Sequence, residues 1–71
     1  MKSITDVQTA VSEKILAFKK TEKMTFDDLG EITGINPATI RSWVRYSQVP
    51  NLYNAYLIAD AMGLSLQELI E

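Results

Sequence analysis

The sequence predicts an all-α fold of five short helices, and three observations lead to that prediction. Apolar residues recur at the three- and four-residue intervals that place side chains on one face of a helix. Residues that cap helices stand where these stretches begin, and glycine or proline follows where most of them end. No sequence typical of a β-hairpin interrupts this pattern. The 71 residues are expected to form a single domain over residues 1–71.

The first helix is expected over about residues 4–21. One helical face carries the apolar residues Ile4, Val7, Val11, Ile15 and Phe18. A capping box at the start is formed either by Ser3 with Asp6 or by Thr5 with Gln8. The lysines around residue 20 complement the helix dipole at the other end.

The second helix is short and is expected to begin after Thr25 as its N-cap. Leu29 and Ile32 are predicted to face inward, and Gly34 ends the helix. Three acidic residues favour its first turns because they complement the helix dipole: Asp27, Asp28 and Glu31.

The third helix is expected from Pro37 to about Tyr46. Asn36 followed by Pro37 is a strong start signal, because Asn caps the helix and Pro suits its first position. The residues predicted to be buried are Ile40, Trp43 and Val44. The helical spacing favours packing over ligand contact for Trp43.

The fourth helix is expected to begin at Asn51, after Pro50, and to end at Gly63. Its predicted buried residues are Leu52, Ala55, Ile58, Ala59 and Met62. Ser65 with Glu68 forms another capping box, which opens a short fifth helix through residues 69 and 70.

Composition excludes several classes of protein. The absence of cysteine excludes disulfides and thiolate nucleophiles, and the absence of histidine removes the commonest metal ligand and general base. Neither an apolar run long enough to span a membrane nor a signal-peptide pattern is present, so a soluble, cytoplasmic protein is expected. We therefore expect no enzyme, no catalytic or metal site, no cofactor, no small-molecule substrate and no membrane partner.

A turn of about three residues containing Gly34 joins the second and third helices, which is the helix-turn-helix layout. From about residue 15 to residue 71 the sequence resembles the Cro/XRE-type helix-turn-helix family of phage and bacterial regulators. The residues that carry the resemblance are Ile15, Phe18, Leu29, Glu31, Gly34, Ile35, Thr39, Ile40, Trp43, Pro50, Leu52, Ile58, Ala59, Gly63, Ser65, Leu66, Glu68 and Leu69. The resemblance implies a compact lambda-repressor-like domain with the helix-turn-helix at about residues 25–46. The small size is similar to that of phage Cro-like lytic-switch regulators and of modulators of repression.

The resemblance implies that the third helix enters the major groove of a double-stranded DNA operator. The positions that match base-facing ones are Pro37, Ala38, Arg41, Ser42 and Arg45, and helical spacing alone places them on one edge. Arg41 is the best candidate for reading guanine, because its planar fork matches O6 and N7 together. The positions implied to lie at the DNA backbone are Thr25, Phe26, Asn36, Thr39 and Gln48.

The sequence also departs from the family pattern. Phe26 stands where Gln is usual, and the loop after the third helix lacks the usual Gly and basic residues. Lys19 and Val44 stand where many members pair an Arg with a Glu. Both partners of that ion pair are replaced here, so no buried charge is left unpaired. The net charge is −2, although every charge between Ile32 and Ala59 is positive.

Two function hypotheses follow. The first is a DNA-binding transcriptional regulator, a phage lysis–lysogeny switch component in the bacterial cytoplasm that acts by promoter occlusion. The second is a protein-binding modulator, or antirepressor, that forms a complex with a cognate phage repressor and alters its DNA binding. Its interface would comprise Asp27, Asp28, Glu31, Tyr53 and Leu57.

Several residues keep an ordinary structural explanation. The three acids of that interface also suit the start of a helix, and Tyr53 alternatively covers its own loop. Arg41 and Arg45 alternatively form a solvated helix face. A homodimer through the fifth helix is a further possibility, for which Leu64, Leu66 and Ile70 are available.

Overall fold

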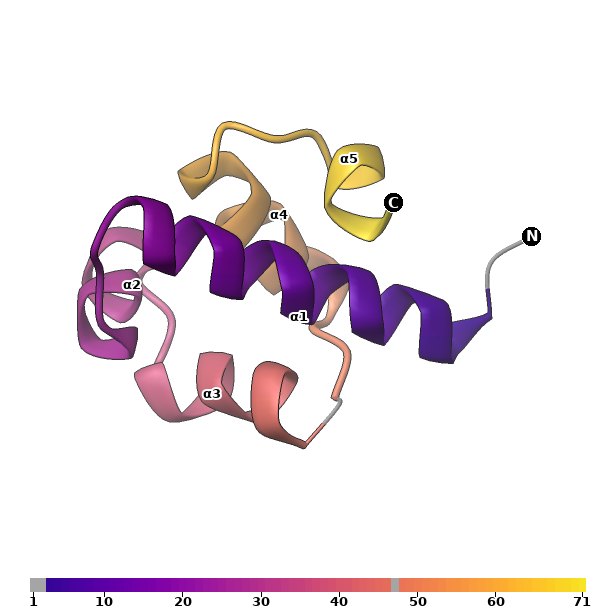
Figure 1. Ribbon diagram of the computed structural model, residues 1–71, viewed down its shortest axis with the longest axis horizontal. Helices are drawn as coiled ribbons and strands as arrows, with labels where there is room; N and C mark the ends of the chain where they lie inside the picture. Colours follow the sequence, from indigo (N-terminus) through magenta and orange to yellow (C-terminus); the bar gives the residue numbers. More distant parts are fainter. Residues whose placement is uncertain (1–2, 47) are drawn as a thin grey trace.

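The computed structural model describes residues 3–46 and 48–71 and contains the five predicted helices (Figure 1). They are α1 (Ile4–Thr21), α2 (Phe26–Thr33), α3 (Pro37–Arg45), α4 (Leu52–Ala61) and α5 (Leu66–Ile70). No strand occurs in these two described ranges. The all-α fold class is therefore confirmed, and the helix ends lie within a residue or two of the predicted ones.

Local hydrogen bonds account for the helix starts. Capping boxes open α1, α2 and α5, and the pairs are Ser3 with Asp6, Thr25 with Asp28, and Ser65 with Glu68. The bonds donated by the Ser65 backbone N–H and hydroxyl lower the pKa of Glu68, because they stabilise its carboxylate. Asn36 and Asn51 cap α3 and α4 through their side-chain oxygens, which accept from the backbone N–H groups of residues 38 and 54 at 2.8 Å.

The longest helix, α1, lies along the long axis of the molecule (Figure 1). α1 contacts α3 and α5, whereas α2 contacts α3 and α4. All five helices contribute to the core, which consists of Val11, Ile15, Leu29, Ile35, Ile40, Trp43, Ile58, Ala59 and Leu69. Trp43 is only 3% exposed, so the packing interpretation of this residue is confirmed.

Three apolar residues are exposed: Ile4, from the predicted apolar face of α1, and Ile32 and Leu52, which were predicted to be buried. Ile4 lies in the first turn of α1, which projects beyond the other helices (Figure 1). Ile32 is exposed because Thr33 takes the inner position of α2; the Thr33 hydroxyl donates to the Leu29 carbonyl at 2.7 Å and accepts from the Ile35 N–H. Leu52 is 76% exposed because it occupies the first position of α4, at the edge of the packed helices. None of the described helices combines the length and apolar character needed to cross a membrane.

Candidate nucleic-acid interface

Gly30 of α2 lies close to the Pro37 ring of α3 and to the turn that joins the two helices. Gly34 has a φ of +76° and ends α2 in the left-handed conformation, with its N–H donating to the Gly30 carbonyl. The chain then turns through the buried Ile35 and starts α3 at Pro37. A methyl group added at Gly30 would lie 2.6 Å from Cγ of Pro37 and 2.8 Å from the Ile35 carbonyl oxygen. The helix-turn-helix therefore has no room for a side chain at residue 30.

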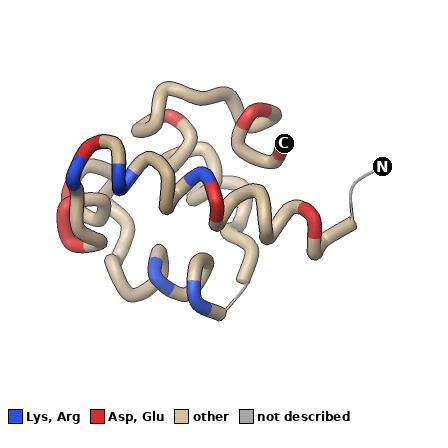
Figure 2. The backbone as a smooth tube through the Cα atoms, in the orientation of Figure 1, with Lys and Arg blue, Asp and Glu red and all other residues tan. Residues whose placement is uncertain are grey.

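The orientation of α3 agrees with the helical-wheel prediction. Ile40 and Trp43 are buried, and Val44 is half-buried against the core. The outer face of the helix is formed by Ala38, Arg41, Ser42 and Arg45, of which Arg41 and Ser42 are half-buried. Both charged side chains of this helix are basic (Figure 2). This face can therefore offer charged donors to DNA.

Two other side chains that are predicted to face the bases, Pro37 and Ser42, already make contacts within the protein. The ring of Pro37 packs toward α2 at Gly30 and is half-buried. The Ser42 hydroxyl donates to the Thr39 carbonyl at 2.6 Å. The guanidinium groups of Arg41 and Arg45 therefore carry most of the donor capacity of the outer face.

The predicted backbone-contacting residues flank α3. The Thr25 hydroxyl accepts from the Asp28 N–H, and the Asn36 side-chain oxygen accepts from the Ala38 N–H. Each cap uses an acceptor, so the Thr25 hydroxyl hydrogen and the Asn36 amide group can still be donated to a phosphate oxygen. Gln48 is exposed after α3.

Phe26 has contacts that sequence reasoning missed. The Lys19 ammonium of α1 lies 5.1 Å from the centre of the Phe26 ring, and the Arg41 guanidinium carbon of α3 lies 5.3 Å from it. The sequence showed only that Phe26 replaces a Gln of the family pattern. Lys19 and Arg41 lie on two other helices rather than beside Phe26 in the sequence, so no local pattern indicated this shared contact.

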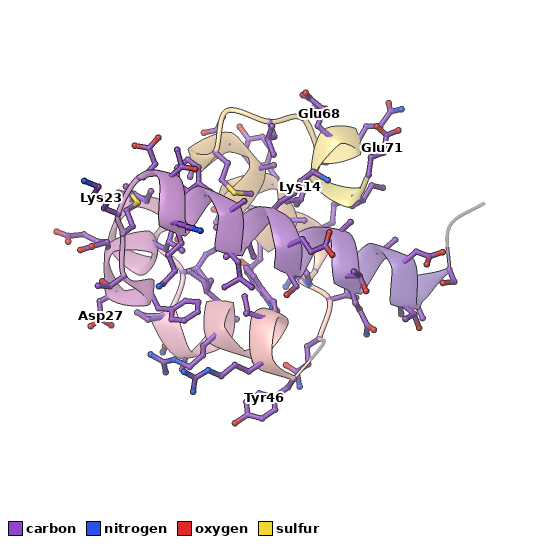
Figure 3. The ribbon with its side chains drawn as sticks, viewed as in Figure 1. Lys14, Lys23, Asp27, Tyr46, Glu68 and Glu71 are labelled. Atoms are coloured by element: carbon purple, nitrogen blue, oxygen red, sulfur yellow. The ribbon has the colours of Figure 1, made fainter. Side chains whose placement is uncertain are left out.

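One end of the candidate interface is formed by α2, and this end carries acidic residues. Asp27, Asp28 and Glu31 are exposed, and the Asp28 carboxylate accepts from the Thr25 backbone N–H. Figure 3 shows Asp27 on α2, whereas Tyr46 lies at the opposite end of α3. These acids reduce the positive potential at the start of α2, so the potential that attracts DNA is stronger along α3. In the part of the chain that the structure describes, no cluster of carboxylates could hold a metal ion.

The remaining predicted interface residues lie on α4. Tyr53 is 69% exposed, so it covers little of its own loop, and Tyr56 beside it is 54% exposed. Leu57 differs from expectation because it is half-buried and packs against the core. The exposed face of α4 therefore pairs Tyr53 with Tyr56 rather than with Leu57.

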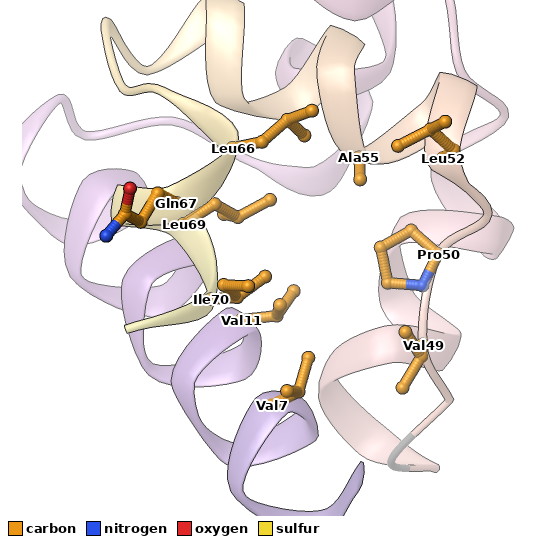
Figure 4. Close-up of a pocket in the computed structure, with 10 residues that line it drawn as sticks. All are labelled: Val7, Val11, Val49, Pro50, Leu52, Ala55, Leu66, Gln67, Leu69 and Ile70. Atoms are coloured by element: carbon orange, nitrogen blue, oxygen red, sulfur yellow. The ribbon is translucent and has the colours of Figure 1, made fainter. Parts of the chain in front are cut away.

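An apolar groove lies between α1, α4 and α5 (Figure 4). Its volume is about 490 Å³. It is lined by Val7, Val11, Val49, Pro50, Leu52, Ala55, Leu66, Gln67, Leu69 and Ile70. Two predicted dimer residues, Leu66 and Ile70, belong to this lining, whereas Leu64 is half-buried against the core.

Comparison with known families agrees with the geometry of α2 and α3. The sequence model of a family described as helix-turn-helix matches residues 17–69. No curated protein and no solved structure matches the chain. The chain belongs to the Cro/C1-type helix-turn-helix family. It is a DNA-binding transcription regulator, and double-stranded DNA is the ligand that this family implies. Such regulators are typically not enzymes.

Proposed function

We propose that the protein is a sequence-specific regulator that inserts α3 into the major groove and occludes a promoter, as a component of a phage lysis–lysogeny switch. The observation that supports this function best is the outer face of α3, which carries Arg41 and Arg45 and no acidic residue. A helix in the major groove blocks the surface that polymerase or a competing repressor needs.

Each residue of the outer face has a distinct proposed role. Arg41 donates its planar fork to O6 and N7 of a guanine, and Ala38 contacts a thymine methyl group. Arg45 lies further along the same edge, at the last position of α3. The donors at the sugar–phosphate backbone are Thr25, Asn36, Thr39 and Gln48. The side chain of Phe26 has no hydrogen-bonding group, so only the backbone N–H of this residue can donate to a phosphate.

Selection from a random DNA library, followed by affinity measurement over a range of salt concentrations, tests this function. We expect one sequence to be enriched and the logarithm of its affinity to fall with the logarithm of salt. The slope is about −0.9 per neutralised phosphate, and we expect roughly two to four phosphates per monomer. Failure to enrich any sequence would remove the proposed function. A much steeper slope would show instead that the lysines of α1 contact the DNA backbone.

A homodimer that uses the apolar groove is part of this proposal, with a second copy of the chain as the occupant. Among the residues that the structure describes, no charged side chain lines the groove, so two identical surfaces can meet there without like-charge repulsion. Leu52 is 76% exposed at its edge and supplies an anchor for the groove of the partner copy. A dimer would place two α3 helices in half-sites about 34 Å apart.

Leu52→Asp is expected to convert the dimer into a monomer, which sedimentation at micromolar concentration measures. Aspartate suits the first position of α4 because it complements the helix dipole, so the fold should persist. Ile32→Asp is the matched control, since Ile32 is also exposed but lies on α2. A wild-type chain that sediments as a monomer, both alone and on DNA, would refute the dimer.

Capture of a cognate repressor is the second candidate function, and the exposed aromatic face of α4 favours it. Aromatic anchors supply much of the affinity at protein interfaces, and Tyr53 and Tyr56 are both more than half exposed. Asp27 provides negative charge that would attract the basic DNA-binding face of a repressor.

Tyr53→Ala is expected to weaken such a complex by more than about 1 kcal/mol without unfolding the domain. Asp27→Asn should mainly slow association at low salt, because an exposed charge acts on the encounter rather than on the final complex. Size exclusion of the mixed proteins shows whether the complex forms, and surface plasmon resonance measures its affinity and association rate. Two separate peaks at micromolar concentration would exclude this second function and leave the DNA-binding one.

A further inference from the structure

The ring of Phe26 contacts cations from two other helices. The Lys19 ammonium and the Arg41 guanidinium carbon lie 5.1 and 5.3 Å from the ring centroid. Both distances fall within the roughly 6 Å over which a cation is attracted to an aromatic face. Phe26 is half-buried at the first position of α2 and packs against the core. The ring therefore connects α1, α2 and α3 at the edge of the proposed DNA-binding face.

We infer that Phe26 is a positioning residue for Arg41, and that its ring sets the specificity at the base pair that Arg41 reads. This inference rests on the proposed DNA-binding function and extends it. A free arginine side chain samples many rotamers, and fixing one of them on DNA costs conformational entropy. A ring anchored against the core restricts the guanidinium before DNA arrives, so less entropy is lost on binding.

In the proposed arrangement the guanidinium of Arg41 meets the ring with its face. Its five N–H donors lie in its plane, so a contact through the face leaves the hydrogen-bonding edge available. Arg41 can therefore rest on Phe26 and still present two parallel donors to guanine. Arg45 is exposed at the end of α3, and no ring contact holds it in the described part of the chain. Of the two arginines on the outer face, Arg41 is therefore the one whose side chain a ring contact restricts before DNA binds.

Lys19 shares the ring but has a different effect. Because both cations contact one ring, they lie within about 10 Å of each other, which is the screening length at 0.1 M salt. The Lys19 ammonium therefore adds to the positive potential around Arg41. Potential of this kind attracts any DNA sequence equally, so Lys19 contributes to affinity and not to base discrimination.

Affinity ratios measured with three variants test the inference. The ratio compares the affinity for the selected operator with the affinity for a second DNA, in which the G·C pair that Arg41 is proposed to read is changed to A·T. Phe26→Leu keeps an apolar side chain but removes the ring, and should lower the ratio about three- to tenfold. Phe26→Tyr keeps the ring and should preserve the ratio. Lys19→Met, the matched control, should weaken binding to both DNAs alike and leave the ratio unchanged.

A nuclear magnetic resonance measurement on the free protein supplies an independent readout. The Arg41 methylene protons next to the guanidinium should show upfield ring-current shifts in the wild type and in Phe26→Tyr, and lose them in Phe26→Leu. Circular dichroism should show the same helix content in all variants. An unchanged affinity ratio in Phe26→Leu, or the absence of ring-current shifts in the wild type, would overturn the positioning role although DNA binding persists. A wild type that prefers no DNA sequence would remove the proposed function itself, while its ring-current shifts would remain.

Discussion

Arg41→Ala is expected to weaken binding to the selected operator by about 1–3 kcal/mol, which is the cost of losing one bidentate contact to guanine. The preference for guanine at that one position should disappear, because alanine has no donor for O6 or N7. The fold should be unaffected, since Arg41 is half-buried on the outer face of α3 and lies outside the core. A gel-shift titration against the operator and its single-pair variants measures both effects.

Lys14→Ala is the matched control for Arg41→Ala because it also removes one positive charge. Figure 3 shows Lys14 on α1, nearer to α5 than to α3. Removing the Lys14 charge should leave the base preference intact. It should lower the affinity for every DNA sequence alike, because it weakens the positive electrostatic potential of the whole protein. If Arg41→Ala binds the operator as tightly as the wild type does, α3 is not oriented in the groove as proposed.

Gly30→Ala is expected to destabilise the domain by about 1–3 kcal/mol, because the added methyl group overlaps Pro37 and the Ile35 carbonyl. A proline ring and a backbone oxygen cannot rotate away as the end of a flexible side chain can. Helix propensity alone predicts the opposite sign, a gain of about 1 kcal/mol for alanine over glycine inside a helix. Thermal unfolding distinguishes destabilisation by overlap from stabilisation by helix propensity, since 1 kcal/mol moves the Tm of so small a domain by roughly 4–8 °C. A higher Tm for Gly30→Ala would contradict the close approach of α2 and α3.

Gly63→Ala separates packing from backbone strain. Gly63 has a φ of +72°, and a methyl group there would meet no atom within 4 Å. Its replacement should cost only the strain of the left-handed conformation, roughly 1–2 kcal/mol, and should leave operator affinity unchanged at temperatures where the variant is folded. Gly30→Ala should also reduce operator affinity under such conditions, because Pro37 must move and α3 moves with it.

The sequence alone determined where the helices begin and end, because these boundaries depend on groups only a few residues apart. Asp28 and Thr25 satisfy each other's backbone N–H groups across three residues, and Asn36 before Pro37 defines the start of α3. The outward position of Arg41 followed from helical spacing in the same way.

Only the tertiary structure decided which side chains are covered and which partners they meet. Thr33 rather than Ile32 faces inward because its hydroxyl finds partners at the turn before α3, and Leu52 is exposed because no helix covers the first turn of α4. Phe26 meets Lys19 and Arg41 because three separate helices converge there. Such contacts depend on the distances and angles between helices, which core packing sets and which local sequence spacing does not contain.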